Sequence, residues 1–333
     1  MISKKRIDRI GEKLKAEKNL NSEELAQLLQ WRDGFSTTLD YYFKKISIKT
    51  DEKERVTLSR RLKRIDSIKI KLKRFKTMRL STLQDIAGLR VVVKSKNALD
   101  EALTALRILP DKHTLKKLDN YTSAPKNDGY RGVHLIYQNK KSDLIEVQLR
   151  TDLQHIWATA VETYGELQNT SFKTGEGDKQ WKDFFSLLSS YFAILENSTP
   201  LDIHLKLSKK KLKTQLKKII KDLKVIERLN ATTNSIQVIV NKQNETGRMG
   251  KYAILELDLK EKTTTIDVYT KKNVTKAIKI YTEKELNYKD NEFKNIVFVN
   301  IEDVEKIQKS YPNYFLDTRN LLKILSQIVL DQL

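Results

Sequence analysis

Residues 127–150 decide the fold, and they read NDGYRGVHLIYQNKKSDLIEVQLR. Two β-prone runs, Val133–Gln138 and Leu144–Leu149, are joined by a short polar segment, which predicts a β-hairpin. Alternation along the second run places polar side chains on one face of the strand, namely Glu146, Gln148 and Arg150. The stretch therefore predicts a sheet with one apolar face and one face of clustered polar groups.

Outward from this hairpin, helical spacing of apolar residues alternates with one more strand. A capping-box pattern joins Asn21 to Glu24, and Asp66 with Ser67 is predicted to cap a helix that carries Ile68. A strand is predicted at residues 89–93 and a mobile polar loop at 165–179. Helices are predicted over residues 1–46, 99–109, 153–167 and 181–195.

The last third has a different pattern. Short strands are predicted at 236–240, 252–259, 264–269, 277–281 and 295–300, and helices near 304–309 and 319–329. Before them, residues 206–224 contain nine Lys and one acid on a basic amphipathic helix. We therefore predict a mixed α/β (α+β) fold: a mixed sheet flanked by helices in domain 1–200, a basic helical linker at 201–230 and a smaller β-rich domain at 231–333.

Charge is concentrated in the first two thirds of the chain. Residues 1–230 hold 48 Lys and Arg against 29 Asp and Glu, whereas residues 231–333 hold 16 against 14. This balance favours a phosphate-bearing partner such as RNA or a nucleoside polyphosphate. A solvated Lys-rich surface is the alternative.

Composition excludes several kinds of site. The chain has no Cys and only four His, so disulfides, iron–sulfur clusters and thiolate zinc sites are excluded. A catalytic metal is therefore expected to be a hard cation held by carboxylates. No run of about 18 apolar residues is present, so we expect no membrane span and a cytoplasmic protein.

Two further segments contain residue types suited to phosphate chemistry. Residues 61–71 read RLKRIDSIKIK, in which cations precede a helix start that can bind phosphate. Residues 85–93 read DIAGLRVVV, with Asp85 at the entry to a strand and Arg90 within it. Asp85 is a candidate hard-metal ligand that could face Glu146 across the sheet. An ordinary basic helix and a capping or turn Asp are the alternatives.

Together these segments resemble the synthetase domain of the RelA/SpoT nucleotidyltransferases, over roughly residues 30–195. The resemblance implies a nucleotidyltransferase-like sheet and a pyrophosphokinase that uses ATP as diphosphate donor and Mg²⁺ as cofactor. It assigns Arg61 and Arg90 to the adenine of ATP, and three residues to its phosphates: Lys63, Ser67 and Lys71. Asp85 and Glu146 would hold Mg²⁺, with Glu146 also acting as general base. Tyr130 would stack on the acceptor base, while Arg131 and His134 would contact acceptor phosphate or diphosphate.

Two departures from the family pattern narrow this expectation. No His–Asp pair occurs in the chain, so hydrolysis of alarmones is not expected. Where small alarmone synthetases commonly have Tyr-Arg-Ser-Leu-His, this chain has Tyr-Arg-Gly-Val-His at residues 130–134. The missing Ser points away from GDP or GTP as the acceptor.

The C-terminal segment SYPNY at residues 310–314 resembles the Tyr-x-x-Tyr element of the fused toxin–antitoxin members of the family (CapRel type). That resemblance implies that Tyr311 and Tyr314 are autoinhibitory, that a phage capsid-type protein releases the enzyme, and that the acceptor is the 3′-CCA end of tRNA. Core packing of the two rings is the alternative. The alternative functions are a (p)ppGpp synthetase acting on GDP or GTP, and a non-catalytic RNA-binding sensor.

Overall fold

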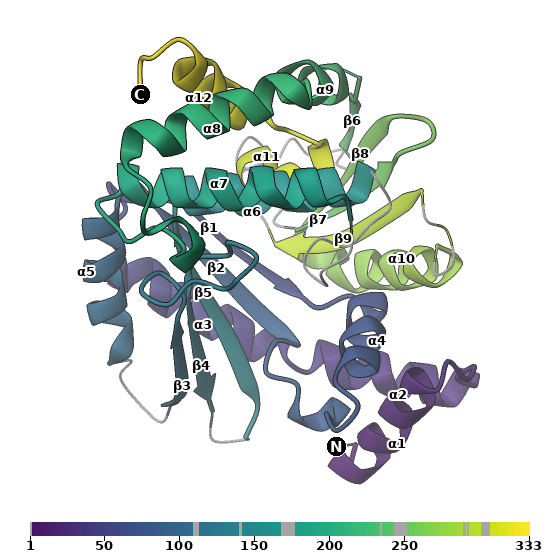
Figure 1. Cartoon of the computed structure of the whole chain (residues 1–333). Helices are drawn as coiled ribbons and strands as arrows, with labels where there is room; N and C mark the ends of the chain where they lie inside the picture. The colour runs from purple at the N-terminus through teal and green to yellow at the C-terminus, as the bar shows by residue number, and fades with distance from the viewer. Residues whose placement is uncertain are drawn as a thin grey trace.

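The described residues form one large mixed sheet. The computed structural model describes residues 2–108, 113–139, 142–167, 177–233, 235–242, 252–288, 291, 293–300 and 307–333. The strand order is β3-β4-β5-β2-β1-β9-β7-β8-β6. The strands are β1 Arg55–Leu62, β2 Ala87–Val93, β3 Thr114–Asn120, β4 Val133–Gln138, β5 Leu144–Thr151, β6 Gln237–Lys242, β7 Tyr252–Asp258, β8 Thr263–Tyr269 and β9 Lys294–Asn300. The predicted mixed α/β class is confirmed (Figure 1).

Strand pairing is parallel in two places and antiparallel elsewhere. β2 runs parallel to β5, and β6 runs parallel to β8. The predicted hairpin is confirmed as β4 and β5, which pair antiparallel. β1 pairs with β9 at Arg61 and Val299, so the sheet runs from the N-terminal part into the C-terminal part. The domain boundaries at residues 200 and 230 stay a prediction.

Helices cover both faces of the sheet (Figure 1). They are α1 Lys4–Lys15, α2 Ser22–Asp33, α3 Ser36–Lys49, α4 Ile65–Arg74, α5 Lys96–Arg107, α6 Asp152–Leu167, α7 Lys179–Leu195, α8 Lys209–Asp222, α9 Val225–Thr233, α10 Val274–Asn287, α11 Ile307–Ser310 and α12 Arg319–Val329. Short 3-10 turns lie at η1 Leu80–Thr82, η3 Asp202–His204, η4 Lys271–Asn273 and η6 Pro312–Phe315. Helices α3 and α5 contact the apolar face of β1, β2 and β5.

Alternation in the central strands produces the two faces. Val147 and Leu149 of β5 are buried in the cluster that includes α3 and α5. The intervening Glu146 and Gln148 therefore point to the opposite face, where α6 contacts β2 and β5. This arrangement leaves the polar face of the sheet beside α6 as the place for a site.

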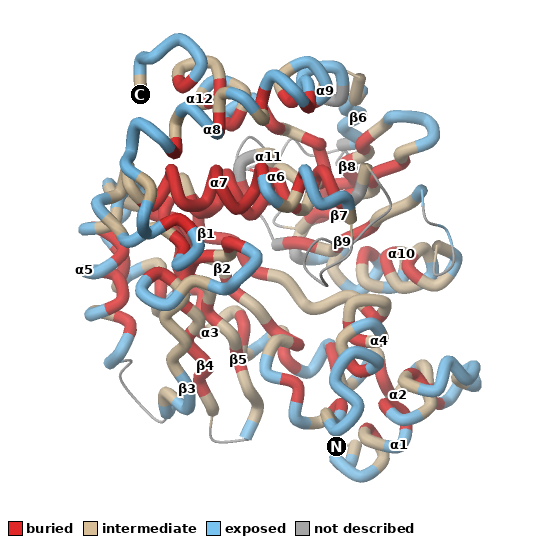
Figure 2. Tube along the Cα trace, in the orientation of Figure 1, coloured by how far each residue is buried: buried red, intermediate tan, exposed pale blue. Residues whose placement is uncertain are grey.

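A helical layer lies over that face. α6 and α7 form one apolar cluster with α8, α9 and α12, and Figure 2 shows α7 buried along most of its length. The predicted basic helix is confirmed as α8, and its apolar stripe packs into this cluster: Leu212, Leu216 and Ile220. α12 contributes Leu321, Leu325 and Ile328 to the same cluster, although it lies at the end of the chain.

One predicted element is wrong, and two strands were not predicted. Residues 277–281 lie in helix α10 instead of a strand, because Ala277, Tyr281 and Glu285 recur at helical spacing and are buried together. The strands that were not predicted are β1 and β3. Predicted residues 168–176 and 301–306 lie outside the described residues.

The predicted cap of α4 is also wrong. α4 begins at Ile65, so Asp66 and Ser67 lie within its first turn. The N–H of Ile65 is bound instead by the carboxylate of Glu285 in α10, at 2.8 Å and 220 residues away in the sequence. Arg32 of α2 donates to the same carboxylate at 2.9 Å, and both side chains are buried. In contrast, the Asn21–Glu24 capping box is confirmed.

Within the described part of the chain, no helix has the length and apolar character needed to cross a membrane.

Candidate functional site

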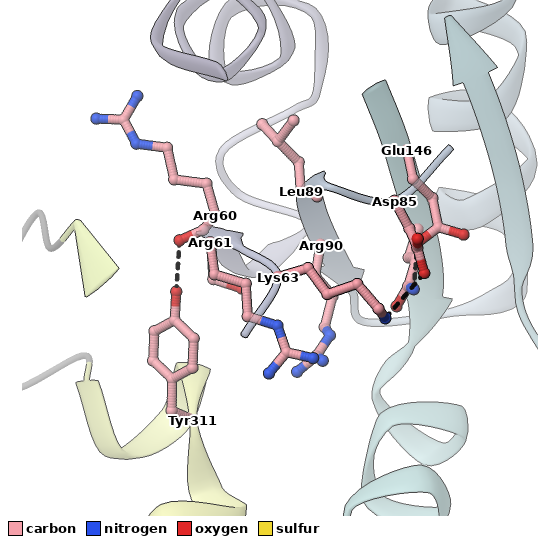
Figure 3. A pocket seen from close by; sticks show the side chains of 11 residues that line it. Arg60, Arg61, Lys63, Asp85, Leu89, Arg90, Glu146 and Tyr311 are labelled. Atoms are coloured by element: carbon pink, nitrogen blue, oxygen red, sulfur yellow. Dashed lines mark hydrogen bonds and ion pairs between the residues drawn. The ribbon is translucent and has the colours of Figure 1, made fainter. Parts of the chain in front are cut away.

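Strands β1, β2 and β5 surround a first cavity of about 80 Å³ on the α6 side of the sheet (Figure 3). Its walls are formed by Ser59, Arg60, Arg61, Lys63, Asp85, Gly88, Leu89, Arg90, Glu146, Gln148 and Tyr311. Five predicted site residues from three strands and the loop before β2 are therefore brought together: Arg61, Lys63, Asp85, Arg90 and Glu146. Tyr311 reaches the same cavity from the C-terminal part of the chain.

Asp85 lies between two lysines in this cavity. Its Oδ2 accepts hydrogen bonds from Lys63 Nζ at 3.0 Å and Lys71 Nζ at 2.8 Å. Burial alone would raise the pKa of Asp85, but the charges of Lys63 and Lys71 outweigh it and hold the pKa below its usual value. Burial likewise lowers the pKa of Lys63 despite the nearby carboxylate. Oδ1 of Asp85 is buried and has no hydrogen-bond partner among the described residues.

Glu146 is held by two neighbours on the sheet. Its Oε1 lies 2.9 Å from Nδ1 of His134, and its Oε2 accepts a hydrogen bond from Gln148 Nε2 at 2.8 Å. Burial raises the pKa of Glu146. The hydrogen bond and charge of His134 lower the pKa by more than burial raises it, so the net pKa lies below the usual value. The negative charge of Asp85 raises the pKa of Glu146, because both carboxylates face the same cavity.

These two carboxylates fit a hard divalent cation. The described residues contain no cluster of three or more His, Asp or Glu that could bind a metal alone. Asp85 nevertheless has a buried oxygen without a partner, beside Glu146. Mg²⁺ is usually held by one or two carboxylates, with substrate phosphates completing its shell. The donor set therefore suits Mg²⁺ that arrives with a polyphosphate.

Arg61 and Arg90 bring two positive charges into the cavity. Figure 3 shows the guanidinium groups of Arg61 and Arg90 close together. Burial and the neighbouring charge of Arg150 lower the pKa of Arg90 to about 10. Among the described residues, the buried Nε of Arg90 has no hydrogen-bond partner. A guanidinium plane can stack on the face of an aromatic base.

Tyr311 lies beside this arginine pair. Its hydroxyl donates to the carbonyl of Arg60 at 2.9 Å, and its side chain is 3% exposed. The pKa of Tyr311 is raised by burial, and the charges of Arg61 and Arg90 oppose that shift. A ring from the C-terminal part thus shares the cavity with the two guanidinium groups.

A second cavity of about 440 Å³ adjoins the first, and Gln148 lines both. Tyr130, His134 and Arg150 form its polar wall. Its apolar wall comes from α6 and α7: Trp157, Ala158, Val161 and Phe185. Three cations lie at its edge: Arg74, Lys126 and Lys182. The cavity therefore combines an aromatic ring, an apolar wall and positive charge beside Glu146, which suits a nucleotide.

Three predicted site residues lie elsewhere. Arg131 is 4% exposed, and its guanidinium donates to Ser189 Oγ and to the carbonyls of Thr122 and Thr199. These bonds hold loops against α7. Ser67 lines neither cavity. Tyr314 packs in the apolar cluster of β7, β8 and β9, with its hydroxyl 3.5 Å from the Ile296 carbonyl.

Gln148 and Arg150 were not assigned a role from the sequence. Both lie on the face of β5 that carries Glu146, so the alternating pattern contained the signal. Glu285 gave no such signal, because only the tertiary fold brings α10 to α4.

The two cavities combine two carboxylates that can bind a metal ion, buried cations and an adjoining pocket large enough for a nucleotide base. This combination is typical of enzymes that transfer phosphoryl groups. A family model described as "Region found in RelA / SpoT proteins" matches residues 60–168 of this chain.

Relatives agree with that match. A GTP pyrophosphokinase of Haemophilus influenzae is 36% identical over 104 residues, which are 31% of this chain and 14% of that protein. A GTP pyrophosphokinase of Photobacterium angustum is 30% identical over 103 residues, 30% of this chain and 13% of that protein. The chain thus matches about a seventh of the length of these relatives. The small alarmone synthetase 2 of Bacillus subtilis has 22% identity and a TM-score of 0.44, covering 50% of this chain and 93% of that one.

Proposed function

We propose that this protein is an ATP-dependent pyrophosphokinase that transfers the β,γ-diphosphate of ATP to the 3′-hydroxyl of the tRNA CCA end. The observation that carries the proposal is the pairing of Asp85 and Glu146 in a cavity that shares the wall residue Gln148 with a second, base-sized cavity. ATP, the diphosphate donor, and the acceptor hydroxyl would then meet at Glu146. Modification of the CCA end would block aminoacylation and so inhibit translation.

In this mechanism the 3′-oxygen of the acceptor attacks the β-phosphorus of ATP. The bond between that phosphorus and the oxygen bridging to the α-phosphate breaks, and AMP leaves with the electron pair. Glu146 accepts the proton of the attacking hydroxyl. Lys63 and Lys71 lie where they can stabilise charge on the transferred diphosphate, and Arg61 with Arg90 would hold the adenine. Asp85 and Glu146 would hold Mg²⁺, which supplies further neutralisation of phosphate charge.

The C-terminal part is proposed to restrain this reaction. Tyr311 occupies space beside Arg61 and Arg90, where an adenine ring would stack. A phage capsid-type protein that binds the C-terminal part would release Tyr311 and open the cavity to ATP. Tyr314 supports this arrangement from the core, since its backbone carbonyl accepts a hydrogen bond from Thr264 of β8 at 2.7 Å.

A (p)ppGpp synthetase is the second candidate, supported by the GTP pyrophosphokinases among the relatives. The deciding experiment incubates the protein with γ-labelled ATP and either bulk tRNA or GDP and GTP. Label on tRNA, absent with the Glu146→Gln variant, is the expected result. Label on GDP or GTP alone would establish the second candidate, and label on neither would contradict both.

Helix α8 would extend the acceptor surface. Ile203 of η3 lines the second cavity, and α8 begins at Lys209, a few residues further along the chain. Lys209, Lys210 and Lys218 are exposed on α8. A tRNA whose 3′ end enters the cavity would therefore have basic side chains beside its backbone.

Reversal of Lys209, Lys210 and Lys218 to Glu should weaken tRNA use while ATP affinity stays unchanged. If all three contact phosphates, the slope of log affinity against log salt should become shallower by about 2.7. The measurement is tRNA binding at several salt concentrations. The matched control reverses Lys272, Lys276 and Lys279, which are exposed on or next to α10. Equal effects of both triple variants would contradict a specific role for α8.

A further inference from the structure

Glu146, His134, Tyr130, Arg150 and Gln148 form a closed hydrogen-bond ring in the wall between the two cavities. Glu146 Oε1 lies 2.9 Å from His134 Nδ1, and His134 Nε2 lies 2.6 Å from the Tyr130 hydroxyl. Arg150 Nη2 donates to the Tyr130 hydroxyl at 3.0 Å and to Gln148 Oε1 at 3.2 Å. Gln148 Nε2 donates back to Glu146 Oε2 at 2.8 Å. Each member therefore contacts two others.

The sheet holds four members of the ring in register. Glu146, Gln148 and Arg150 occupy alternate positions on β5, so their side chains leave the same face. His134 of β4 pairs directly with Gln148 across the sheet. Only Tyr130 comes from a loop, and its position depends on the strand residues that bind its hydroxyl.

Gly132 leaves space for the last contact of the ring. Its φ is +148°, and a Cβ at this position would lie 3.2 Å from Arg150 Cγ and 3.3 Å from the Tyr130 hydroxyl oxygen. A side chain there would have to displace Arg150 or Tyr130, as well as adopt an unfavourable backbone conformation. The absence of a side chain at Gly132 therefore allows Arg150 and Tyr130 to keep their places in the hydrogen-bond ring.

Tyr130 presents two separable groups. Its ring lies on the wall of the second cavity, with its centroid 5.0 Å from Lys126 Nζ and 5.1 Å from Arg150 Cζ. Its hydroxyl is bound by His134 and Arg150 within the hydrogen-bond ring. The ring face can contact an acceptor base, while the hydroxyl is connected through His134 to the carboxylate of Glu146.

We propose that the Tyr130 hydroxyl, Gln148 and Arg150 are positioning residues that orient Glu146 and align it with the acceptor bound against Tyr130. This inference rests on the proposed function, in which Glu146 takes the proton of the acceptor. Both oxygens of Glu146 are held before any substrate binds, so little orientational freedom is lost in the reaction. The Tyr130 side chain thus contacts the acceptor through its aromatic face and orients the general base Glu146 through its hydroxyl. The hydroxyl contributes to turnover, and the aromatic face contributes to acceptor binding.

Two substitutions at one position separate these contributions. Tyr130→Phe removes only the hydroxyl, whereas Tyr130→Ala also removes the aromatic face. We expect Tyr130→Phe to lower kcat by about tenfold to a hundredfold, the cost of a misplaced catalytic group, with acceptor KM nearly unchanged. Tyr130→Ala should in addition raise acceptor KM, with little change in ATP affinity. The control is Tyr121→Phe, a neighbouring ring 5.9 Å away and outside the hydrogen-bond ring, which should behave as the wild type.

A wild-type kcat in Tyr130→Phe would overturn the proposal, and so would a loss confined to KM. A second readout does not depend on turnover: the imidazole ¹⁵N signals of His134, assigned among the four His of the chain with a His134→Asn variant. Tyr130→Phe should shift the His134 signals and leave those of the other three His unchanged, while Tyr121→Phe shifts none. Unchanged His134 signals would show that the hydrogen-bond ring does not form in solution. Absence of transfer by the wild type to any acceptor would instead contradict the proposed function.

Discussion

Replacement of either carboxylate of the first cavity should abolish diphosphate transfer while the protein stays folded. For Glu146→Gln we expect a loss of roughly 10² to 10⁴-fold in kcat, the range that a positioned general base contributes. Asp85→Asn should be at least as severe, because it removes a metal ligand and also leaves Lys63 and Lys71 without their shared partner. The measurement is the transfer of label from γ-labelled ATP at saturating acceptor.

Matched controls separate this loss from general effects of the substitutions. Glu101→Gln on the exposed surface of α5 and Asp119→Asn on β3 change the same chemical groups outside both cavities. Both should retain wild-type transfer. Circular dichroism and the melting temperature should show that the Asp85 and Glu146 variants remain folded. Near-wild-type transfer by either variant would remove the metal-site assignment.

Removal of the Tyr311 ring should strengthen ATP binding by about tenfold or more, which corresponds to about 1.4 kcal/mol of lost competition. Tyr311→Leu is preferred to Tyr311→Ala, since a leucine keeps apolar contact with the cluster of β7–β9 but cannot stack on the guanidinium groups. The variant should also be more toxic on expression without a trigger. Equilibrium titration with a non-hydrolysable ATP analogue measures the change.

Two companion variants identify the cause. Tyr311→Phe keeps the ring and loses only the bond to the Arg60 carbonyl, so its effect on ATP affinity should be smaller than that of Tyr311→Leu. Tyr314→Leu should lower the melting temperature with little change in ATP affinity, because Tyr314 lies in the core. If Tyr311→Leu lowers the melting temperature and leaves ATP affinity unchanged, Tyr311 is a core residue and the proposed restraint is wrong.

The hairpin and the polar face of β5 could be predicted because their signals are local. Residues 145–150 alternate between apolar and polar, so the strand and the face that carries Glu146 follow from one pattern. Strand β1 carried a weaker signal, since Arg60 and Arg61 sit inside it and are more typical of a helix surface. Arg60 is accommodated only by long-range contacts with Asp40 at 2.8 Å and the Phe43 ring.

Other features depended on partners that the sequence does not reveal. Arg131 was predicted to bind an acceptor, but its guanidinium donates to the carbonyls of Thr122 and Thr199. Tyr311 and Tyr314 were predicted to act together because residues 310–314 resemble the Tyr-x-x-Tyr element. Tyr311 precedes the turn η6 with non-helical dihedrals, φ −133° and ψ 50°. Both rings belong to the cluster of β7–β9, but only Tyr311 also lines the first cavity.

The place of α12 has a consequence in genetic terms. Its three buried side chains, Leu321, Leu325 and Ile328, complete the cluster built on α6, α7 and α8, which cover the site. Burial of each is worth about 1.5–3 kcal/mol, against a total stability of about 5–15 kcal/mol for a typical protein. A stop codon or frameshift upstream of Tyr311 would therefore remove both the restraining residue and α12, and so destabilise the catalytic part. Under the proposed function, a truncating mutation would abolish the activity of the protein. Only substitutions such as those at Tyr311 could yield a stable, unrestrained enzyme.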